Sequence, residues 1–321
     1  MRIRTFHQRG LLIACLLLIC CILLLVSACG GGVLASQPHP QITPTQTPQV
    51  DWKPVDQAIG KGGVAMAGGI HRYSFPRTDL TVTVQGVHLK AGFALGGYAA
   101  FLPVGKAAMA MGDLVLTEDE INPVLSALQQ GGIEQTALHN HLLFETPHVM
   151  YLHFGGQGNP VQLARTLHAA LILTRTPLSA PASRPTSSLD LDTAQLDAIV
   201  GYHGKANNGV YQYSIPRAES ITDGGMVIPP AMGIATAINF QPTGDGNAAI
   251  TGDFTLIAKE VPLVLRTLRE QGITITALHS HMLFDSPHLF YIHFWANENA
   301  VKLAHGLRAA LDQTNSAKAS T

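Results

Sequence analysis

An internal duplication constrains the fold of this chain more than any other feature of its sequence. At an offset of 140 residues, "HRYSFPR" (71–77) matches "YQYSIPR" (211–217), and from 131 to 171 the chain matches its second copy at 22 of 41 positions without a gap. Similarity at a fixed spacing indicates repeated structural units. We therefore predict two tandem copies of one domain, at residues 51–175 and 190–314.

The order of patterns within a copy predicts an α+β domain. Alternation of apolar with small or polar residues is typical of a strand, whereas a Thr cap, an acidic first turn and a closing Gly-Gly delimit a helix. An Asn cap followed by Pro indicates a second helix. In the first copy these patterns predict strand, helix, strand, strand and helix at 108–116, 117–130, 133–141, 148–154 and 159–173. This β-α-β-β-α core favours a mixed or antiparallel sheet with helices packed on one face.

The N-terminus has the layout of a secretory signal. Three arginines precede a long apolar run that ends in "VSACGGG", a phrase that resembles the bacterial lipobox, in which the cysteine is acylated. We predict a signal peptide at 1–28 and a lipid anchor at Cys29, which would hold the protein outside the cytoplasm on the bacterial membrane. A plain transmembrane anchor is the alternative, because the 18-residue apolar run is just long enough to span a bilayer.

Stretches without apolar periodicity separate the predicted parts of the chain. Residues 29–50 are rich in Pro, Thr, Gln and Gly, which is typical of an extended tether. Residues 176–189 have a similar composition and are interpreted as the linker between the two copies. Residues 315–321 form a short tail after the second copy.

Charge and cysteine content exclude several classes of site. The formal net charge of −1 gives no electrostatic signal for nucleic acid, so no nucleic-acid partner is predicted. Of the four cysteines, three leave with the predicted signal peptide and Cys29 carries the lipid. This arrangement excludes disulfides, thiolate metal sites and cysteine nucleophiles from the folded part. A metal site here must use His, Asp, Glu or Met.

The most closely copied phrase is rich in histidine. "TALHNHLLFETPHVMYLHF" (136–154) returns as "TALHSHMLFDSPHLFYIHF" (276–294), and the two hold eight of the fifteen histidines. His139 and His141 stand two apart on a predicted strand, so their side chains point to one face and can bind one ion. Glu145 follows four residues later and adds a carboxylate. The second copy repeats this arrangement with His279, His281 and Asp285.

These residue types suit a divalent transition metal. Two neutral imidazoles and a carboxylate bind Zn, Mn, Fe, Ni or Cu and leave positions open to water or substrate. His153 and its copy His293 end a strand before a loop, a common place for functional residues, and complete the predicted metal set. A simple hairpin brings His148 nearer than His153 to His141, but the spacing of five gives His148 and His153 opposite strand parity, so both cannot face His139 unless a bulge intervenes. His148 and His288 are therefore kept as predicted neighbours of the site.

Two other polar residues recur in both copies. Asp113 and Asp253 each follow a glycine, and Arg77 and Arg217 each follow a proline. For the aspartates we favour a turn residue over a role in orienting a histidine. For the arginines we favour a solvated loop over an anion site.

Three long phrases, "ALHNHLLFETPHVMYLHF", "GDLVLTEDEINPVLSALQQGGI" and "HFWANENAVKLAHGLRAAL", resemble those of a known family. This is the LppY/LpqO lipoprotein family, also called DUF1259, whose bacterial secreted members have no established biochemical function. The resemblance covers nearly all of the mature chain and includes the duplicated layout. It implies an arginine after the loop proline, where this chain has His148 and His288, and so favours His139, His141 and His153 with their copies.

A shorter likeness links the stretch 139–145 to the first metal motif of cupins, and two copies would suggest a bicupin. The glycine expected soon after the Glu is absent, however, and two capped helices in each copy do not suit a small all-β barrel.

Three functions remain open from the sequence. The first is an extracytoplasmic lipoprotein that binds a transition metal or a small ligand through a His-x-His-x3-Glu/Asp site in each copy. The second is a metal-dependent enzyme in which Glu145 or Asp285 acts as a general base. The third is a structural or interaction module in which the histidines form a hydrogen-bond network where the two copies pack on each other.

Overall fold

The computed structural model describes residues 50–179 and 189–319. The predicted signal peptide, the anchor at Cys29 and most of the two predicted linkers lie outside these described residues. Among the described helices, none is both long and apolar enough to cross a membrane.

Each repeat forms one six-stranded antiparallel sheet, which confirms the predicted α+β class. The strand order is β1-β2-β5-β6-β9-β7 in the first repeat and β10-β11-β14-β15-β18-β16 in the second. The strands of the first sheet are β1 (Val64–Ala65), β2 (His71–Pro76), β5 (Gly96–Val104), β6 (Ala107–Thr117), β7 (Glu134–His139) and β9 (Val149–Gly158). Those of the second are β10 (Lys205–Asn207), β11 (Val210–Ile215), β14 (Thr236–Gly244), β15 (Asn247–Ile257), β16 (Thr274–His279) and β18 (Leu289–Asn299).

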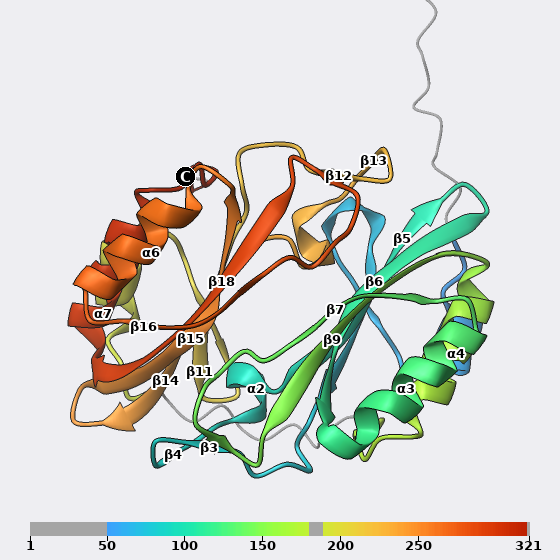
Figure 1. Ribbon diagram of the computed structural model, residues 1–321, viewed down its shortest axis with the longest axis horizontal. Coiled ribbons are helices and arrows are strands. Elements are labelled where there is room, and N and C mark those ends of the chain that lie inside the picture. The colour runs from blue at the N-terminus through green and yellow to red at the C-terminus, as the bar shows by residue number, and fades with distance from the viewer. Residues whose placement is uncertain (1–49, 180–188, 320–321) are drawn as a thin grey trace, which may run out of the picture. The chain divides into compact units, whose positions relative to one another are not determined.

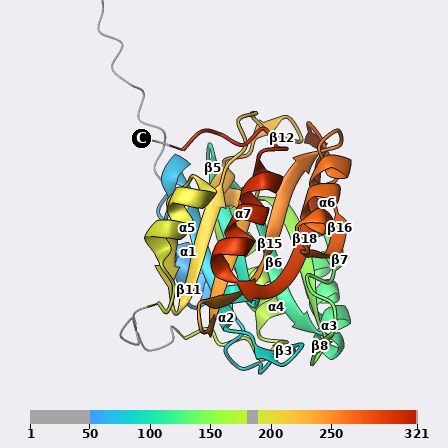
Figure 2. The ribbon, with the colours of Figure 1, turned by 90° about the vertical axis from the view of Figure 1, so that its left-hand side faces the viewer.

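Helices cover one face of each sheet, as the sequence predicted. They are α1 (Lys53–Ile59), α3 (Glu118–Gln130) and α4 (Pro160–Leu171) in the first repeat, and α5 (Thr193–Val200), α6 (Val261–Glu270) and α7 (Ala300–Leu311) in the second. Figure 2 shows the second set side by side in front of its sheet. A core of buried apolar side chains, including Leu152 and Phe154 of β9, fills the space between the first sheet and its helices.

Short elements connect the long strands. They are α2 (Ala91–Ala94), the 3-10 turns η1 (Ala67–Gly69) and η2 (Pro230–Met232), and the short strands β3 (Thr83–Val84), β4 (Val87–His88), β8 (Glu145–Thr146), β12 (Thr222–Asp223), β13 (Met226–Val227) and β17 (Asp285–Ser286). The short strands form two small sheets, β4-β3-β8 and β13-β12-β17.

The helix-free faces of the two sheets meet. One buried apolar cluster joins Val115 and Tyr151 of the first repeat to Ala249 and Trp295 of the second. A second buried apolar cluster, which includes Ala100 of β5, also joins the two repeats. It corresponds to the first cluster with the roles of the two repeats exchanged. Figure 1 shows the result as four layers, with helices outside and the two sheets between them.

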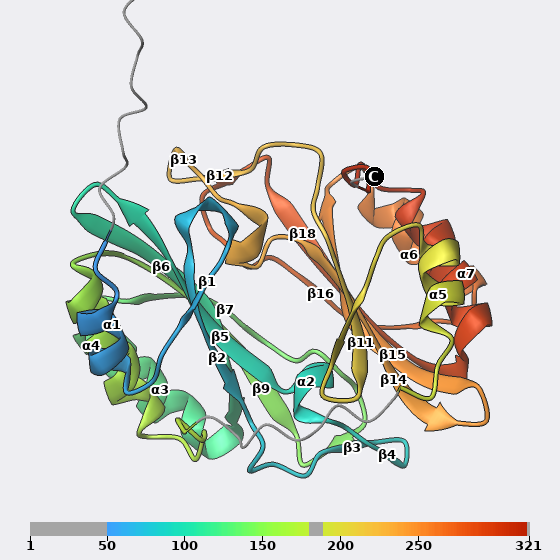
Figure 3. The same cartoon turned by 180° about the vertical axis from the view of Figure 1, so that it is seen from behind.

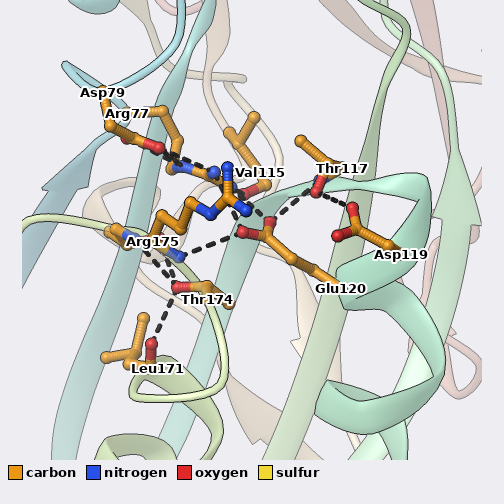
Figure 4. A network of polar contacts seen from close by, with 10 residues as sticks. Arg77, Asp79, Val115, Thr117, Asp119, Glu120, Leu171, Thr174 and Arg175 are labelled. Atoms are coloured by element: carbon orange, nitrogen blue, oxygen red, sulfur yellow. Dashed lines mark hydrogen bonds and ion pairs between the residues drawn. The ribbon is translucent and has the colours of Figure 1, made fainter.

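Arg77 corrects the prediction of a solvated loop arginine, because its side chain is only 1% exposed. Its guanidinium donates to Glu120 Oε2 at 2.6 Å, to the carbonyl of Val115 at 2.7 Å and to Asp79 (Figure 4). Glu120 also accepts from the backbone N–H of Thr117 at 2.9 Å, which closes the capping box at the start of α3. The pair therefore fixes helix α3 on its sheet.

The second repeat contains the same buried pair. Arg217 donates to Glu260 Oε2 at 2.7 Å and to the carbonyl of Thr255 at 2.8 Å. The prediction of a solvated loop is thus wrong for both arginines, because their partner carboxylates lie 43 residues further along the chain.

Replacement of Arg77 by alanine is expected to lower the free energy of unfolding by about 3–5 kcal/mol, because the carboxylate of Glu120 is left buried without its partner. Urea-induced unfolding measures this change. Arg165→Ala, on the exposed side of α4, is the matched control and is expected to change the free energy by less than about 0.5 kcal/mol. Equal effects of the two substitutions would contradict a structural role for the buried pair.

Candidate metal centre between the repeats

Six histidines from the two repeats gather between the sheets and form one histidine cluster. They are His139, His141, His153, His279, His281 and His293. Rings of the first repeat stack on rings of the second, with centroids 3.5 Å apart for His139 and His279 and 3.9 Å apart for His141 and His293. The prediction of a separate site in each copy therefore missed that each copy's histidines interleave with those of the other.

The cluster follows an approximate two-fold relation. Exchanging each residue for its copy 140 positions away maps the pair His139–His279 onto itself and maps His141–His293 onto His281–His153, whose ring centroids are 3.7 Å apart. The repeats therefore pack in the manner of a symmetric dimer within one chain.

Strand register places these side chains on the helix-free face. His139 lies opposite Tyr151, and Ala137 lies opposite His153, after a register shift in β7. Because successive residues of a strand alternate between faces, Tyr151 and His153 point toward the other repeat, while Leu152 points toward the helices. This register shift is an irregularity of the strand that the spacing of residues in the sequence does not reveal.

Asp113 corrects the interpretation as a turn residue. It lies within β6 directly opposite His153, and it is only 6% exposed. Its Oδ2 lies 4.0 Å from His141 Nε2 and 3.9 Å from His153 Nε2. Asp253 holds the matching position opposite His293 in β15. The recurring Gly-Asp dipeptide was the available sequence signal for these residues.

Within the described residues, four groups have three ligand atoms within 4.8 Å of one another. Two of them take an aspartate and two histidines from a single repeat, and we name them the first triad (Asp113, His141, His153) and the second triad (Asp253, His281, His293). The other two groups cross between repeats and are His139, His141, His293 and His139, His279, His281.

Hydrogen bonds fix the tautomers of several rings. Nδ1 of His139 donates to the carbonyl of Asn140 at 3.1 Å, and Nδ1 of His293 donates to the carbonyl of Gly252 at 3.0 Å. A carbonyl can only accept, so Nδ1 carries the proton and Nε2 offers its lone pair. The Nε2 atoms of all six histidines are buried without a hydrogen-bond partner among the described residues. Each is therefore free to bind an ion.

Burial sets the charge states of the cluster. Desolvation lowers the pKa of His139 to about 4 and that of His279 to about 3, so both rings are neutral near pH 7. Burial, together with the charge of Asp253, raises the pKa of Asp113 to about 8. A divalent cation in the triad would reverse this shift, because it favours the carboxylate.

The predicted carboxylates lie outside the cluster. Glu145 Oε1 accepts from the backbone N–H of Val149 at 3.2 Å, and Asp285 Oδ2 accepts from that of Leu289 at 2.7 Å. Both side chains close the turn before the next strand, and neither belongs to the four groups. The expected His-x-His-x3-Glu/Asp set is therefore not assembled, and Asp113 and Asp253 stand in its place.

The predicted neighbours also lie apart. His148 is half-exposed, with its Nδ1 3.2 Å from Glu118 Oε1, and His288 Nδ1 lies 2.6 Å from Asp285 Oδ1. Neither joins the histidine cluster. The structure thus brings together the histidines at 139, 141 and 153 and their copies, and leaves those after the loop proline outside.

A cavity of about 630 Å³ adjoins the cluster and reaches both triads. It lies between β2 and β5 of the first sheet and β11 and β14 of the second, beneath η1 and η2. Figure 3 shows β2 and β11 on the side of the molecule opposite to β7 and β16. Sequence patterns gave no sign of this cavity, because its lining comes from elements distant in the chain.

A model of the family described as "Domain of Unknown Function (DUF1259)" matches residues 53–172 and 194–313. The chain belongs to this family. Two tandem copies confirm the duplication. No curated protein matches the chain. A trimeric bacterial microcompartment shell protein, PduB, is 13% identical over 80% of this chain and 96% of its own, with a TM-score of 0.21, too low to support a fold comparison.

Without bound metal, this member of the DUF1259 family is expected to lose stability as the pH falls below about 6.5. The pKa of His139 is about 4 in the folded protein and 6.5 ordinarily, so the unfolded state takes up the proton first. For this ring alone, the free energy of unfolding falls by up to about 1.4 kcal/mol per pH unit between these two values. Urea-induced unfolding at stepped pH measures the slope.

The aspartates act in the opposite sense, because folded Asp113 keeps a proton that the unfolded chain loses above its ordinary pKa of 3.8. Six buried histidines outnumber two such aspartates, so the histidines set the sign below pH 6.5. Long-range ¹H–¹⁵N spectra report each ring separately. An imidazolium signal from His139 or His279 at pH 6 would contradict the expectation.

Proposed function

We propose that this protein binds divalent transition metal ions between its two repeats, one ion at each triad. The observation that carries the proposal is the set of six buried Nε2 atoms that have no hydrogen-bond partner among the described residues. Buried polar atoms are normally satisfied, and an unsatisfied one costs about 1–3 kcal/mol. A bound cation would satisfy several of them together.

A purely structural histidine network is less consistent with these contacts. Such a network would pair ring nitrogens with other side chains, whereas the recorded hydrogen bonds of His139, His279 and His293 all use Nδ1 and a backbone carbonyl. This is the pattern seen for metal ligands, in which an outer partner orients the ring and leaves the other nitrogen for the ion.

The ligand types favour a borderline metal. Two imidazoles and one carboxylate suit Fe, Mn, Zn, Ni or Cu, and three protein ligands leave coordination positions open. His139 and His279 lie between the two triads and offer a further nitrogen on each side.

Metal analysis distinguishes this proposal from the sequence-based set. We expect purified protein to retain metal after dialysis, and Asp113→Asn with Asp253→Asn to lose most of it, since the carboxylate of each triad is removed. Glu145→Gln with Asp285→Asn should retain it, as should His148→Ala with His288→Ala. Elemental mass spectrometry gives the content.

The opposite pattern, with metal lost only in the Glu145 and Asp285 variant, would refute the triads and restore the sequence-based set. Absence of metal from protein loaded with each candidate ion in turn would refute the proposal as a whole. Because Glu145 caps a turn, unfolding curves of every variant accompany the measurement.

A metal-dependent enzyme is the second candidate. The cavity favours it, because a space of about 630 Å³ beside open coordination positions has the size of a small-molecule site. Asp113 and Asp253 face this cavity, whereas Glu145 and Asp285 do not line it.

We also propose that the protein is an LppY/LpqO-type lipoprotein that is attached outside the cytoplasm through Cys29 and acts in metal sensing, scavenging or delivery. The lipobox-like sequence supports this attachment. Cys29→Ser in the full chain is expected to abolish lipid labelling and to shift the protein out of the lipid-anchored fraction. Unchanged incorporation of a fatty-acid probe would exclude Cys29 as the anchor.

A further inference from the structure

The cavity beside the triads is built unequally from the two repeats. Arg72 and Tyr98 line it from the first repeat, whereas Ser214 and Ala237 line it from the second. Asp113 and Asp253 form its inner end together with three histidines of the cluster. Prolines 216, 229 and 230 and small residues of η1 and η2 make the remaining wall largely apolar. The cavity thus has a polar end and an apolar body.

Arg72 has donors to spare at this cavity. Its guanidinium lies over the ring of Tyr98 at 3.7 Å, and its Nη1 donates to the carbonyl of Ala231 at 2.7 Å. Within the described ranges no other hydrogen bond and no ion pair is recorded for it. Arg77 and Arg217, by contrast, are each held by two carboxylates and a carbonyl. Arginine has five N–H donors, so most of those of Arg72 are uncommitted.

The second repeat has a neutral residue at the equivalent position. Gln212 takes the position of Arg72, and its amide donates to the carbonyl of Gly92 in α2 at 2.8 Å. Asn239 donates to the carbonyl of Phe93 at 3.2 Å, and the ring of Phe93 packs edge-on against Trp295. Gln212 and Asn239 thus contact α2 much as Arg72 and Tyr98 contact η2. They bring no positive charge, so the cavity carries a cation from the first repeat, while the matching position of the second repeat holds a neutral amide.

We infer that this cavity binds one small organic carboxylate, with its carboxylate held by Arg72 and its apolar body against the prolines of the wall. The inference rests on the proposed metal function and identifies the ligand class of that site. A planar guanidinium matches a carboxylate in a two-pronged arrangement. A single arginine beside two aspartates offers too few donors for a phosphate group, which binds clusters of cations or backbone N–H groups.

Charge balance favours an anion in the loaded protein. A divalent cation at each triad would outweigh the single charge of its aspartate, so the inner end of the cavity would become positive. Arg72 adds a further positive charge, which interacts with the carboxylate of Asp113 but forms no ion pair with a described carboxylate. A carboxylate ligand would offset both, and its second oxygen can approach an open metal position.

Calorimetric titration of the metal-loaded chain tests the inference with acetate, hexanoate and benzoate as probes. Benzamide is the neutral match for benzoate, and methyl phosphate is the alternative anion. We expect benzoate or hexanoate to bind more tightly than acetate, because the wall is apolar, and benzamide to bind at least about tenfold more weakly than benzoate, because a charged hydrogen bond is lost.

Arg72→Gln introduces the residue of the second repeat and is expected to weaken carboxylate binding by about tenfold or more while metal content stays unchanged. Arg72→Lys keeps the charge and should lose less. Arg165→Gln is the matched control on an exposed helix surface and should bind as the original chain does. Unfolding curves of each variant show that the fold is retained.

Several results would overturn the inference. One is that no carboxylate binds at concentrations up to about 10 mM, which is weaker than useful recognition. The others are that benzamide binds as tightly as benzoate, that methyl phosphate binds more tightly than benzoate, or that the Arg72→Gln variant binds benzoate with unchanged affinity.

Titration of metal-free protein separates this inference from the metal proposal. We expect the metal-free protein to bind carboxylates with lower affinity, and this binding to depend on Arg72 as well. If no ion binds the triads but this dependence remains, the metal proposal fails and the carboxylate site stands. If ions bind and the dependence is absent, the carboxylate site alone fails.

Discussion

Desolvation of six neutral imidazoles between two sheets is the interaction on which the rest of this structure depends. Burial of a ring without partners is costly, and here backbone carbonyls satisfy Nδ1 of three rings, while Nε2 of all six has no hydrogen-bond partner in the described part of the chain. The same burial keeps the rings neutral, which is the form that binds metal. Apolar clusters that join the repeats on either side hold the sheets together around this polar centre. Stability and the proposed chemistry therefore arise from one arrangement.

Fusion of the two copies in one chain allows symmetry at the centre and divergence around it. The triads and the stacked rings keep the two-fold relation because each ring packs against one from the other copy. Further out this constraint weakens. Gln212 stands where the first repeat has Arg72, and Trp295 stands where it has Gly155. Two identical subunits cannot differ in this way, so an asymmetric cavity beside a symmetric centre follows from the tandem arrangement.

Local patterns predicted the elements of the fold, but not the partners that each element meets. Caps, alternation and the repeat sufficed for the β-α-β-β-α core, because these signals act within a few residues. The recurrence of the histidine-rich phrase in both copies also identified the three histidines of each repeat that enter the cluster. Asp113 escaped because its neighbour His153 lies on another strand, 40 residues away. Glu145 was predicted to be a metal ligand, whereas its carboxylate accepts a hydrogen bond from the Val149 N–H in a turn. This contact is also local, but the residue types around it give no signal of it.

The arrangement also links ion binding to the association of the repeats. Each triad takes its three ligands from one repeat, but His141 is covered by His293 and His153 by His281, both from the other. A separated repeat would hold the same ligands in water, where the rings protonate more readily and compete with the ion. An ion that binds the desolvated triads more tightly than the triads of a separated repeat must therefore stabilise the contact between the sheets. The size of this stabilisation is set by the difference between the two affinities. In this way, the histidines that make the interface costly without an ion would stabilise it once ions are bound.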